Sequence, residues 1–429
     1  MLRATLAVAA CALASGSAFA GLSRAVVFVS DQINDVILRM EDRNGDGDVT
    51  DPGEVTIFND DLDATLGVEN TQGIVPLSQR SIISVDNFAP DNAVLMRDLN
   101  ANGDTREAGE RNVWFNGAVP GGYFLTNPAS LTRAPNGIFY LLDNNGLDDS
   151  SPEAVYAIED LNQNDVIDAN EISTHVLLSP VGTSDFILEF DVAPDGTGYL
   201  FDISDPVTIL KVDPSGSPMT PILTSTDLFA LSGFTMTLSG TLAEMTFLPS
   251  NEIVVGGFRG NSVVILALKD RNNSGAIDQL NEFRVMWDED LHAAGFNTGS
   301  PRDLSYLASD GSLFWTDGLS DRIWRLVDRN QDDDYNDPNE TLIYYDSADF
   351  TGQLSATLMQ TIATLTACPA DLTDDGTVDL ADLAALLANF GLPAGPAEGD
   401  TTGDGLVDLA DLAELLSAFG TDCPPVTRA

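Results

Sequence analysis

Lysine and histidine are almost missing from this chain of 429 residues, which contains only Lys211, Lys269, His175 and His292. Zinc centres built from several histidine ligands are therefore excluded. Basic residues total 19 against 67 acidic ones, which gives a formal charge of −48. Nucleic acids and anionic membranes are excluded as partners, because both would repel such a chain.

Charged residues make up only 20% of the chain, and hydrophobic residues make up 43%. This composition excludes a disordered acidic tail and indicates a packed core. After the N-terminal region no apolar run approaches the ~18 residues of a membrane-spanning helix. The acidic surface suits a protein that binds many cations.

The first twenty residues have the features of a secretory signal peptide. Arg3 precedes an apolar run over residues 4–15, and Ala18-Phe19-Ala20 fits a small-x-small cleavage site. We therefore expect a mature chain from Gly21 that is secreted or associated with the cell surface. A lipoprotein box at residues 8–11 is the alternative, but cleavage there leaves a very short apolar region.

Cysteine occurs only at positions 11, 368 and 423. If Cys11 is removed with the signal peptide, Cys368 and Cys423 bracket a C-terminal segment. An exported protein can keep a disulfide, so we predict that the two are joined. Two unpaired thiols are the alternative.

An acidic motif recurs along residues 21–367. Its copies begin at Asp42, Asp98, Asp160, Asp270 and Asp328, so they are 56, 62, 110 and 58 residues apart. The interval of 110 is close to two periods, and residues 207–213 within it resemble the same unit without the acidic motif. The chain therefore predicts six repeats of about 58 residues.

Each repeat contains short apolar runs separated by turn residues. One run ends in a turn, as at residues 139–143, a second leads into the acidic motif, as at 155–158, and a third follows it, as at 175–178. A fourth lies upstream in most repeats, as at residues 303–307. Four short antiparallel strands repeated six times predict an all-β six-bladed propeller, with a β-solenoid as the alternative.

The first repeat lacks its upstream strand. We expect residues 358–363 to supply it and to close the ring, which leaves no open sheet edge. The propeller segment resembles secreted six-bladed propellers of the NHL and gluconolactonase kind, through pieces such as residues 309–317 (SDGSLFWTD). That resemblance implies the fold and no activity.

The acidic motifs place side-chain oxygens at alternate positions, as calcium requires. They are EF-hand-like loops between strands, with a trailing Glu, and the alternative is that Asp, Asn and Gly simply favour turns. The expected calcium ligands are Asp42, Asn44, Asp46, Asp48 and Glu54; Asp98, Asn100, Asn102, Asp104 and Glu110; Asp160, Asn162, Asn164 and Glu171; Asp270, Asn272, Ser274 and Glu282; Asp328, Asn330, Asp332, Asp334 and Glu340.

Residues 371–383 and 400–412 repeat one pattern, DLTDDGTVDLADL and DTTGDGLVDLADL, and each leads into an apolar helix. This resembles a type I dockerin, a pair of loop-helix calcium motifs, over residues 368–424, with 425–429 as a tail. It is most similar to the Cys-bracketed tails of planctomycete exported proteins. The resemblance implies calcium ligands at Asp371, Thr373, Asp375, Asp379, Asp382, Asp400, Thr402, Asp404, Asp408 and Asp411.

Two features differ from cellulosomal dockerins. Thr373 and Thr402 stand where Asn or Asp is usual, and Leu380-Ala381 and Leu409-Ala410 stand where hydroxyl residues read the cohesin. We therefore expect calcium binding in this small all-α domain. A cohesin-like or other surface receptor is the expected partner, with a glycan as a further candidate ligand.

Five repeats carry an aspartate where an apolar run ends, and the fifth repeat has Gly256-Gly257 instead. A carboxylate ring that holds a metal, as in propeller lactonases, and simple turn hydrogen bonding are the two interpretations. Repetition favours turn bonding, because a catalytic site breaks symmetry. The five aspartates are Asp31, Asp86, Asp143, Asp202 and Asp317.

Two functions remain open from the sequence. The leading hypothesis is an exported calcium-binding propeller scaffold, tethered to an extracellular partner by its dockerin-like tail. The rival is a tethered hydrolase or lyase that acts on polysaccharide or lactone. The rival predicts a metal on unequal carboxylates in the central channel, whereas the scaffold predicts ions in the peripheral loops alone.

Overall fold

The computed structural model describes residues 24–60, 70–87, 91–119, 123–125, 127–144, 153–178, 187–213, 215–216, 218–234, 245–260, 262–292, 301–357, 359–393, 395 and 398–423. The predicted signal peptide, residues 1–20, lies outside these ranges. Within them no helix has the length and apolar character that a membrane crossing needs.

Six antiparallel sheets of four strands form the main body, one for each predicted repeat. Blade 1 contains β26 (Met359–Thr366), β1 (Ala25–Asp31), β2 (Val36–Glu41) and β3 (Val55–Asp60). Blade 2 contains β4 (Thr71–Ser78), β5 (Ser81–Asp86), β6 (Asn92–Arg97) and β7 (Arg111–Asn116). Blade 3 contains β10 (Pro128–Arg133), β11 (Phe139–Asp143), β12 (Ala154–Ile158) and β13 (Ile172–Leu177).

The other three sheets follow the same order. Blade 4 contains β14 (Ile187–Val192), β15 (Gly198–Asp202), β16 (Thr208–Val212) and β17 (Met219–Thr224). Blade 5 contains β18 (Met245–Phe247), β19 (Ile253–Arg259), β20 (Ser262–Leu268) and β21 (Phe283–Asp288). Blade 6 contains β22 (Pro301–Leu307), β23 (Ser312–Asp317), β24 (Arg322–Leu326) and β25 (Thr341–Asp346).

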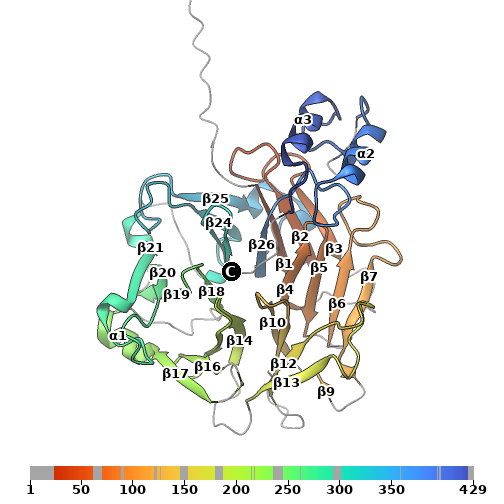
Figure 1. Cartoon of the computed structure of the whole chain (residues 1–429). Helices are drawn as coiled ribbons and strands as arrows, with labels where there is room; N and C mark the ends of the chain where they lie inside the picture. The colour runs from red at the N-terminus through yellow and green to blue at the C-terminus, as the bar shows by residue number, and fades with distance from the viewer. Residues whose placement is uncertain are drawn as a thin grey trace, which may run out of the picture.

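The first strands of the sheets form a closed ring. Strand β26 contacts β4, β4 contacts β10, and the series continues through β14, β18 and β22 back to β26. The sheets therefore surround one axis, and the prediction of a six-bladed propeller is confirmed (Figure 1).

The last strand of the ring completes the first blade. Strand β26 pairs with β1 from Ala25 opposite Thr366 to Asp31 opposite Met359. This confirms the predicted ring closure over residues 359–363, while Leu358 lies outside the described residues. Ala367 continues the contact, since its N–H donates to the carbonyl of Arg24 at 2.8 Å.

Within the described part of the chain, the first strand of each blade has one edge that pairs with no other strand. At several of these edges a side chain of the neighbouring blade accepts the free backbone N–H. Asp303 accepts the N–H of Ile362 at 2.5 Å, and Glu189 accepts that of Met245 at 2.5 Å. Ser130 does the same for Phe190 at 3.1 Å. Because an unpaired buried N–H is costly, these contacts fix each blade against the next.

Apolar side chains fill the spaces between neighbouring sheets. An aromatic cluster lies between blades 5 and 6, where Trp287, Trp315 and Trp324 are fully buried. Each such side chain contributes about 1.5–3 kcal/mol or more on burial. The core is therefore distributed around the ring and has no single centre.

Few helices accompany the sheets. The helix α1 (Ser225–Ser232) follows β17, and a small hairpin joins β8 (Ala118–Val119) to β9 (Tyr123–Phe124). Short 3₁₀ turns are η1 (Leu280–Glu282), η2 (Glu289–Leu291), η3 (Ser347–Asp349) and η4 (Gly352–Leu354).

The C-terminal segment forms two helices, α2 (Leu380–Ala388) and α3 (Leu409–Ala418). Val378, Leu386, Val407 and Leu415 form the centre of its small core. A disulfide joins Cys368 and Cys423. We call residues 368–423 the tail module; in Figure 1 its helices lie above one rim of the propeller, next to β2 and β3.

Candidate metal centres

The five acidic loops occupy equivalent places in the propeller. Each joins the third strand of its blade to the fourth, so the loops lie between β2 and β3, β6 and β7, β12 and β13, β20 and β21, and β24 and β25. We number the positions of each loop from its first Asp. The flanking elements are strands, as the sequence predicts.

The first Asp of each loop organises the turn. Asp42 accepts the N–H groups of Asp46 at 3.2 Å and Gly47 at 2.9 Å, which are positions 5 and 6. The first Asp of every loop makes the same two contacts, in the pairs Asp98–Asn102/Gly103, Asp160–Asn164/Asp165, Asp270–Ser274/Gly275 and Asp328–Asp332/Asp333.

Position 6 has a positive φ in all five loops. Three loops have glycine there, whereas Asp165 (φ 64°) and Asp333 (φ 71°) adopt the same conformation without it. Asp tolerates this region better than most residues, because its short side chain bonds to the local backbone. The two loops without glycine therefore keep the same backbone path as the other three.

The trailing Glu ties the two ends of each loop together. Glu54 accepts the N–H groups of Arg43 at 2.8 Å and Asn44 at 3.3 Å with one oxygen, and that of Asp51 at 3.2 Å with the other. Glu110, Glu171, Glu282 and Glu340 bind the corresponding backbone groups. Both oxygens of the trailing Glu therefore shape the loop.

Each loop has a further acidic residue that accepts a side-chain amide hydrogen bond from within the loop. The donor is the third residue in four loops and the fifth, Asn102, in loop 2. These acids are not among the ligands that the sequence predicts. In loop 1 this residue is Asp51, which accepts a hydrogen bond from the amide of Asn44 at 2.5 Å. Its counterparts are Glu107, Asp168, Asp278 and Asp337. The signal is visible in the sequence as an acid three or four residues before the trailing Glu, as in DPGE (51–54) and EAGE (107–110).

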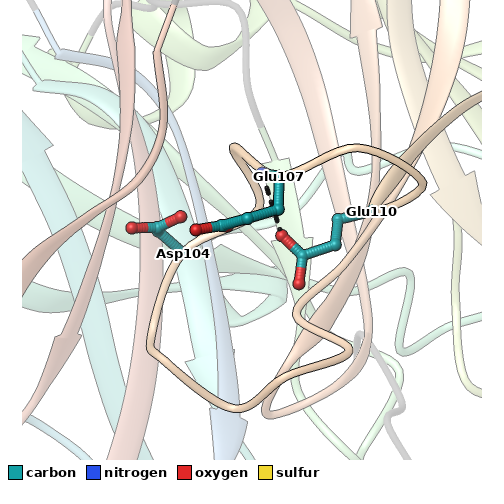
Figure 2. Close-up of side chains that lie close together, drawn as sticks. All are labelled: Asp104, Glu107 and Glu110. Atoms are coloured by element: carbon teal, nitrogen blue, oxygen red, sulfur yellow. Dashed lines mark hydrogen bonds between the residues drawn. The ribbon is translucent and has the colours of Figure 1, made fainter.

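Loop 2 shows the densest arrangement of carboxylates. Oxygens of Asp104, Glu107 and Glu110 lie within 4.8 Å of one another, and within the described ranges no other three acids, histidines or cysteines lie so close (Figure 2). The carboxyl of Glu110 raises the pKa of the neighbouring Glu107. Crowding of this kind favours protonation or a bound cation.

The chemistry of the donor set fits a hard cation. The side chains at positions 1, 3 and 5 and the additional acid offer carboxylate, amide or hydroxyl oxygens, which calcium prefers. Burial raises the pKa of Asp42, Glu54 and Asp98 above the usual value. Hydrogen bonds from backbone N–H groups oppose this shift but do not cancel it. The middle positions, such as Asn44 and Asp46, are exposed, so the loops are open to solvent.

The residue at position 8 of each loop makes a backbone hydrogen bond to the neighbouring blade. Its N–H donates to a carbonyl in the outer strand of the preceding blade, as from Val49 to Tyr344 at 3.0 Å. The other four pairs span 2.7–2.8 Å and are Thr105–Phe58, Ile167–Trp114, Ile277–Ile222 and Tyr335–Met286. The acidic loops therefore join the outer edges of neighbouring blades.

Blade 4 has no acidic loop and uses a short turn at the same place. Asp213 accepts the N–H of Ser215 at 2.9 Å, and Gly216 lies directly against His175 in β13. A Cβ on Gly216 would lie 1.7 Å from the carbonyl oxygen of His175. The sixth junction is thus held by close packing.

The two tail loops have the same internal geometry as the propeller loops. Asp371 accepts the N–H groups of Asp375 and Gly376, and Asp400 those of Asp404 and Gly405, at 2.8–3.2 Å. Asp382 and Asp411 each accept the N–H and hydroxyl of the threonine at position 3, Thr373 or Thr402. Asp379 and Asp408 cap helices α2 and α3.

The aspartates at the strand ends are engaged in local turns. Each is the last residue of the second strand in its blade. Asp31 accepts the N–H of Ile33 and Asp317 that of Leu319, at 2.8 and 3.0 Å. Asp202 binds Ser204, while Asp86 and Asp143 bind the residue before their own inner strand. In blade 5, β19 runs through the two glycines to Arg259.

A polar pocket of about 660 Å³ lies between blades 5 and 6. Tyr306 and Tyr335 line it together with Glu252, Arg271 and Arg284. Arg271 pairs with Glu252 at 2.7 Å. The pocket therefore offers aromatic rings and fixed charged groups beside two acidic loops.

No protein-family model and no curated protein sequence matches the chain. Solved structures that resemble it include a chain of a nidogen/laminin complex, at 12% identity and a TM-score of 0.48, covering 80% of this chain and 100% of that one. A putative 6-phosphogluconolactonase from Bacteroides uniformis has 10% identity, a TM-score of 0.45, and coverage of 80% and 100%. A gluconolactonase from Xanthomonas campestris has 12% identity and a TM-score of 0.40, and the match covers 75% of this chain and 84% of that one. Such likenesses indicate no activity.

Proposed function

We propose that this protein is an exported propeller scaffold whose acidic loops bind calcium and whose surface binds or displays a ligand outside the cell. The observation that supports this most is the common geometry of seven loops. In each of them the first Asp binds the backbone at positions 5 and 6, and a trailing acid ties the loop ends together. The recurrence of side-chain oxygens at the same positions in seven loops supports a shared ligand, beyond the turn hydrogen bonds that the first Asp and the trailing acid make.

Bound calcium would supply positive charge to the crowded carboxylates. The side chains at positions 1, 3 and 5 and the additional acid, such as Asp42, Asn44, Asp46 and Asp51, would hold the ion. The trailing Glu would keep the loop closed, and the N–H at position 8 would pass that rigidity to the preceding blade. Seven ions that each neutralise two charges would reduce the formal charge from −48 to about −34.

The dockerin-like tail remains part of this proposal as a tether to a surface receptor, with a cohesin-like protein as the model partner. The polar pocket between blades 5 and 6 is the preferred place for a ligand such as a glycan. The enzyme hypothesis gains no support from the strand-end aspartates, because their carboxylates accept turn hydrogen bonds.

The test is calcium titration of the complete chain after chelation, followed by calorimetry and thermal melts. We expect about seven ions and a large rise in melting temperature, because a ligand that binds only the native state stabilises it. Asp42→Asn should remove one ion. The matched control Asp213→Asn, in the blade without an acidic loop, should leave the number unchanged. A melting temperature that does not respond to calcium would refute the proposal.

A further inference from the structure

The tail module has an unusually one-sided charge. Residues 368–423 contain ten Asp and two Glu and no Lys or Arg. The propeller face beneath it carries Arg24, Arg39, Arg43 and Arg80, four of the few basic residues in the chain, and the single carboxylate of Glu41 is shared by the first three. Opposite charges on two facing surfaces provide both attraction and orientation.

The first tail loop lies on the turn between β4 and β5 in blade 2. Arg80 donates to the carbonyl of Leu372 at 2.5 Å, and Gln79 donates to the carbonyls of Cys368 and Asp371 at 3.0 and 3.1 Å. The hydroxyl of Ser78 donates to the carboxylate of Asp374. Main-chain atoms of the module, as well as its charge, are therefore recognised.

The second tail loop lies on blade 1. Arg24 donates to the carbonyl of Thr401 at 2.8 Å and lies 3.7 Å from the carboxylate of Glu414. Gly403 packs against Arg43 so closely that a Cβ on the glycine would lie 3.1 Å from the Cβ of the arginine. The acidic loops therefore face the propeller.

The two loops are related by internal repetition, but their contacts are not equivalent. Asp374 and Gly403 are both the fourth residue of their loops. With the module turned to its other orientation, the side chain of Asp374 would press on Arg43. Ser78 would then face a glycine, which has no acceptor side chain.

We propose that the rim of blades 1 and 2 is a specific receptor for the tail module of the same chain. The module is seated there by its two acidic loops, in only one of the two orientations that its internal symmetry permits. The arginines attract the module, and the difference between Asp374 and Gly403 selects the orientation. The propeller and tail thus behave in solution as one body.

The test is disulfide trapping in the full chain, read by mass spectrometry of the linked peptides. Ser78→Cys with Asp374→Cys should form a cross-link. The control, Arg43→Cys with Asp374→Cys, joins two positions that would meet only in the other orientation, and it should not. Equal yields from both pairs would overturn the single orientation, and no cross-link from either would overturn the docking.

Charge reversal tests the role of the arginines. Adding Arg24→Glu and Arg80→Glu to the first cysteine pair should reduce the cross-linking rate about tenfold or more, because two charged hydrogen bonds are lost and repulsion replaces them. Arg271→Glu with Arg329→Glu, two exposed arginines of blades 5 and 6, is the matched control and should leave the rate unchanged. An equal loss in both variants would overturn the electrostatic receptor. Circular dichroism melts establish that each variant is folded.

Discussion

The carboxylate of Asp303 in blade 6 accepts the backbone N–H of Ile362 in strand β26 at 2.5 Å, across the junction where the ring closes. Its other oxygen accepts the N–H of Leu304 at 2.6 Å. One buried side chain therefore serves backbone groups of two blades. Blade closure depends on such contacts as well as on the ladder between β26 and β1.

Replacing this side chain tests the closure. We expect Asp303→Ala to lower the free energy of unfolding by about 2 kcal/mol or more, because buried N–H groups lose their acceptor. Urea unfolding at fixed calcium concentration measures the change. Asp195→Ala, which removes an acceptor from an exposed turn in blade 4, is the control and should cost less than about 1 kcal/mol. Equal losses would show that Asp303 has no special role.

The packed junction between blades 3 and 4 gives a second prediction. Gly216→Ala and Gly196→Ala both place a side chain at a positive φ, 86° and 87°, which costs about 1–2 kcal/mol. Only the alanine at 216 would also collide with the carbonyl of His175, whereas nothing lies within 4 Å at 196. Thermal melts should show a much larger loss for Gly216→Ala. Similar losses of melting temperature would mean that the backbone at this junction moves apart at little cost and is not tightly packed.

The carboxylates of loop 2 predict effects of opposite sign with and without calcium. Glu107→Gln removes one charge from the cluster with Asp104 and Glu110, so the melting temperature should rise slightly in chelator. The increase on adding calcium should become smaller, because a ligand charge is lost. Asp195→Asn is the single-charge control and should change neither value. A larger calcium response in Glu107→Gln would contradict the role of this acid.

The pKa of His175 gives a direct measure of its burial. Burial lowers the pKa of His175 below its usual value, and its ring contacts Tyr140 and Phe190. Protonation therefore favours the unfolded chain. The stabilising contribution is complete above the unfolded pKa, near 6.5, and is lost as the pH falls toward the lower folded pKa.

NMR titration can follow His175 separately, because His292 is the only other histidine. We expect a pKa below 6.5 for His175 in the folded protein. Its contribution to stability appears as the difference between wild type and His175→Gln in melting temperature from pH 7.5 to 5.5. The wild type should lose more on acidification. A folded pKa at or above 6.5 would contradict this account.

Local signals made the blades predictable from the sequence. Short apolar runs and turn residues recur with the acidic loops, and the missing first strand indicated that the chain end closes the ring. The internal contacts of the loops were less accessible. Whether Glu54 bonds to backbone or faces an ion depends on the path of the loop. Asp51 is the tenth residue of its loop and falls outside the alternating positions, so the spacing of oxygens does not point to it.

Contacts between repeats could not be predicted in this way. The bond from Val49 to Tyr344 joins the first blade to the last, and the bond from Arg24 to Thr401 joins residues 377 positions apart. Nothing in the local pattern of either segment specifies its partner. Such pairs follow from the closed ring and from the seat of the tail on its rim, both of which require the three-dimensional arrangement.

Strand β26 is at once the closing strand of the ring and the segment that leads into Cys368. A force that had pulled the tail module off the rim would therefore pass directly into β26. The backbone ladder to β1 and the bonds from Ile362 to Asp303 and from Thr364 to Ser305 would resist it. The mechanical strength of the attachment is thus the strength of ring closure, and a load that detached the last strand would open the propeller itself.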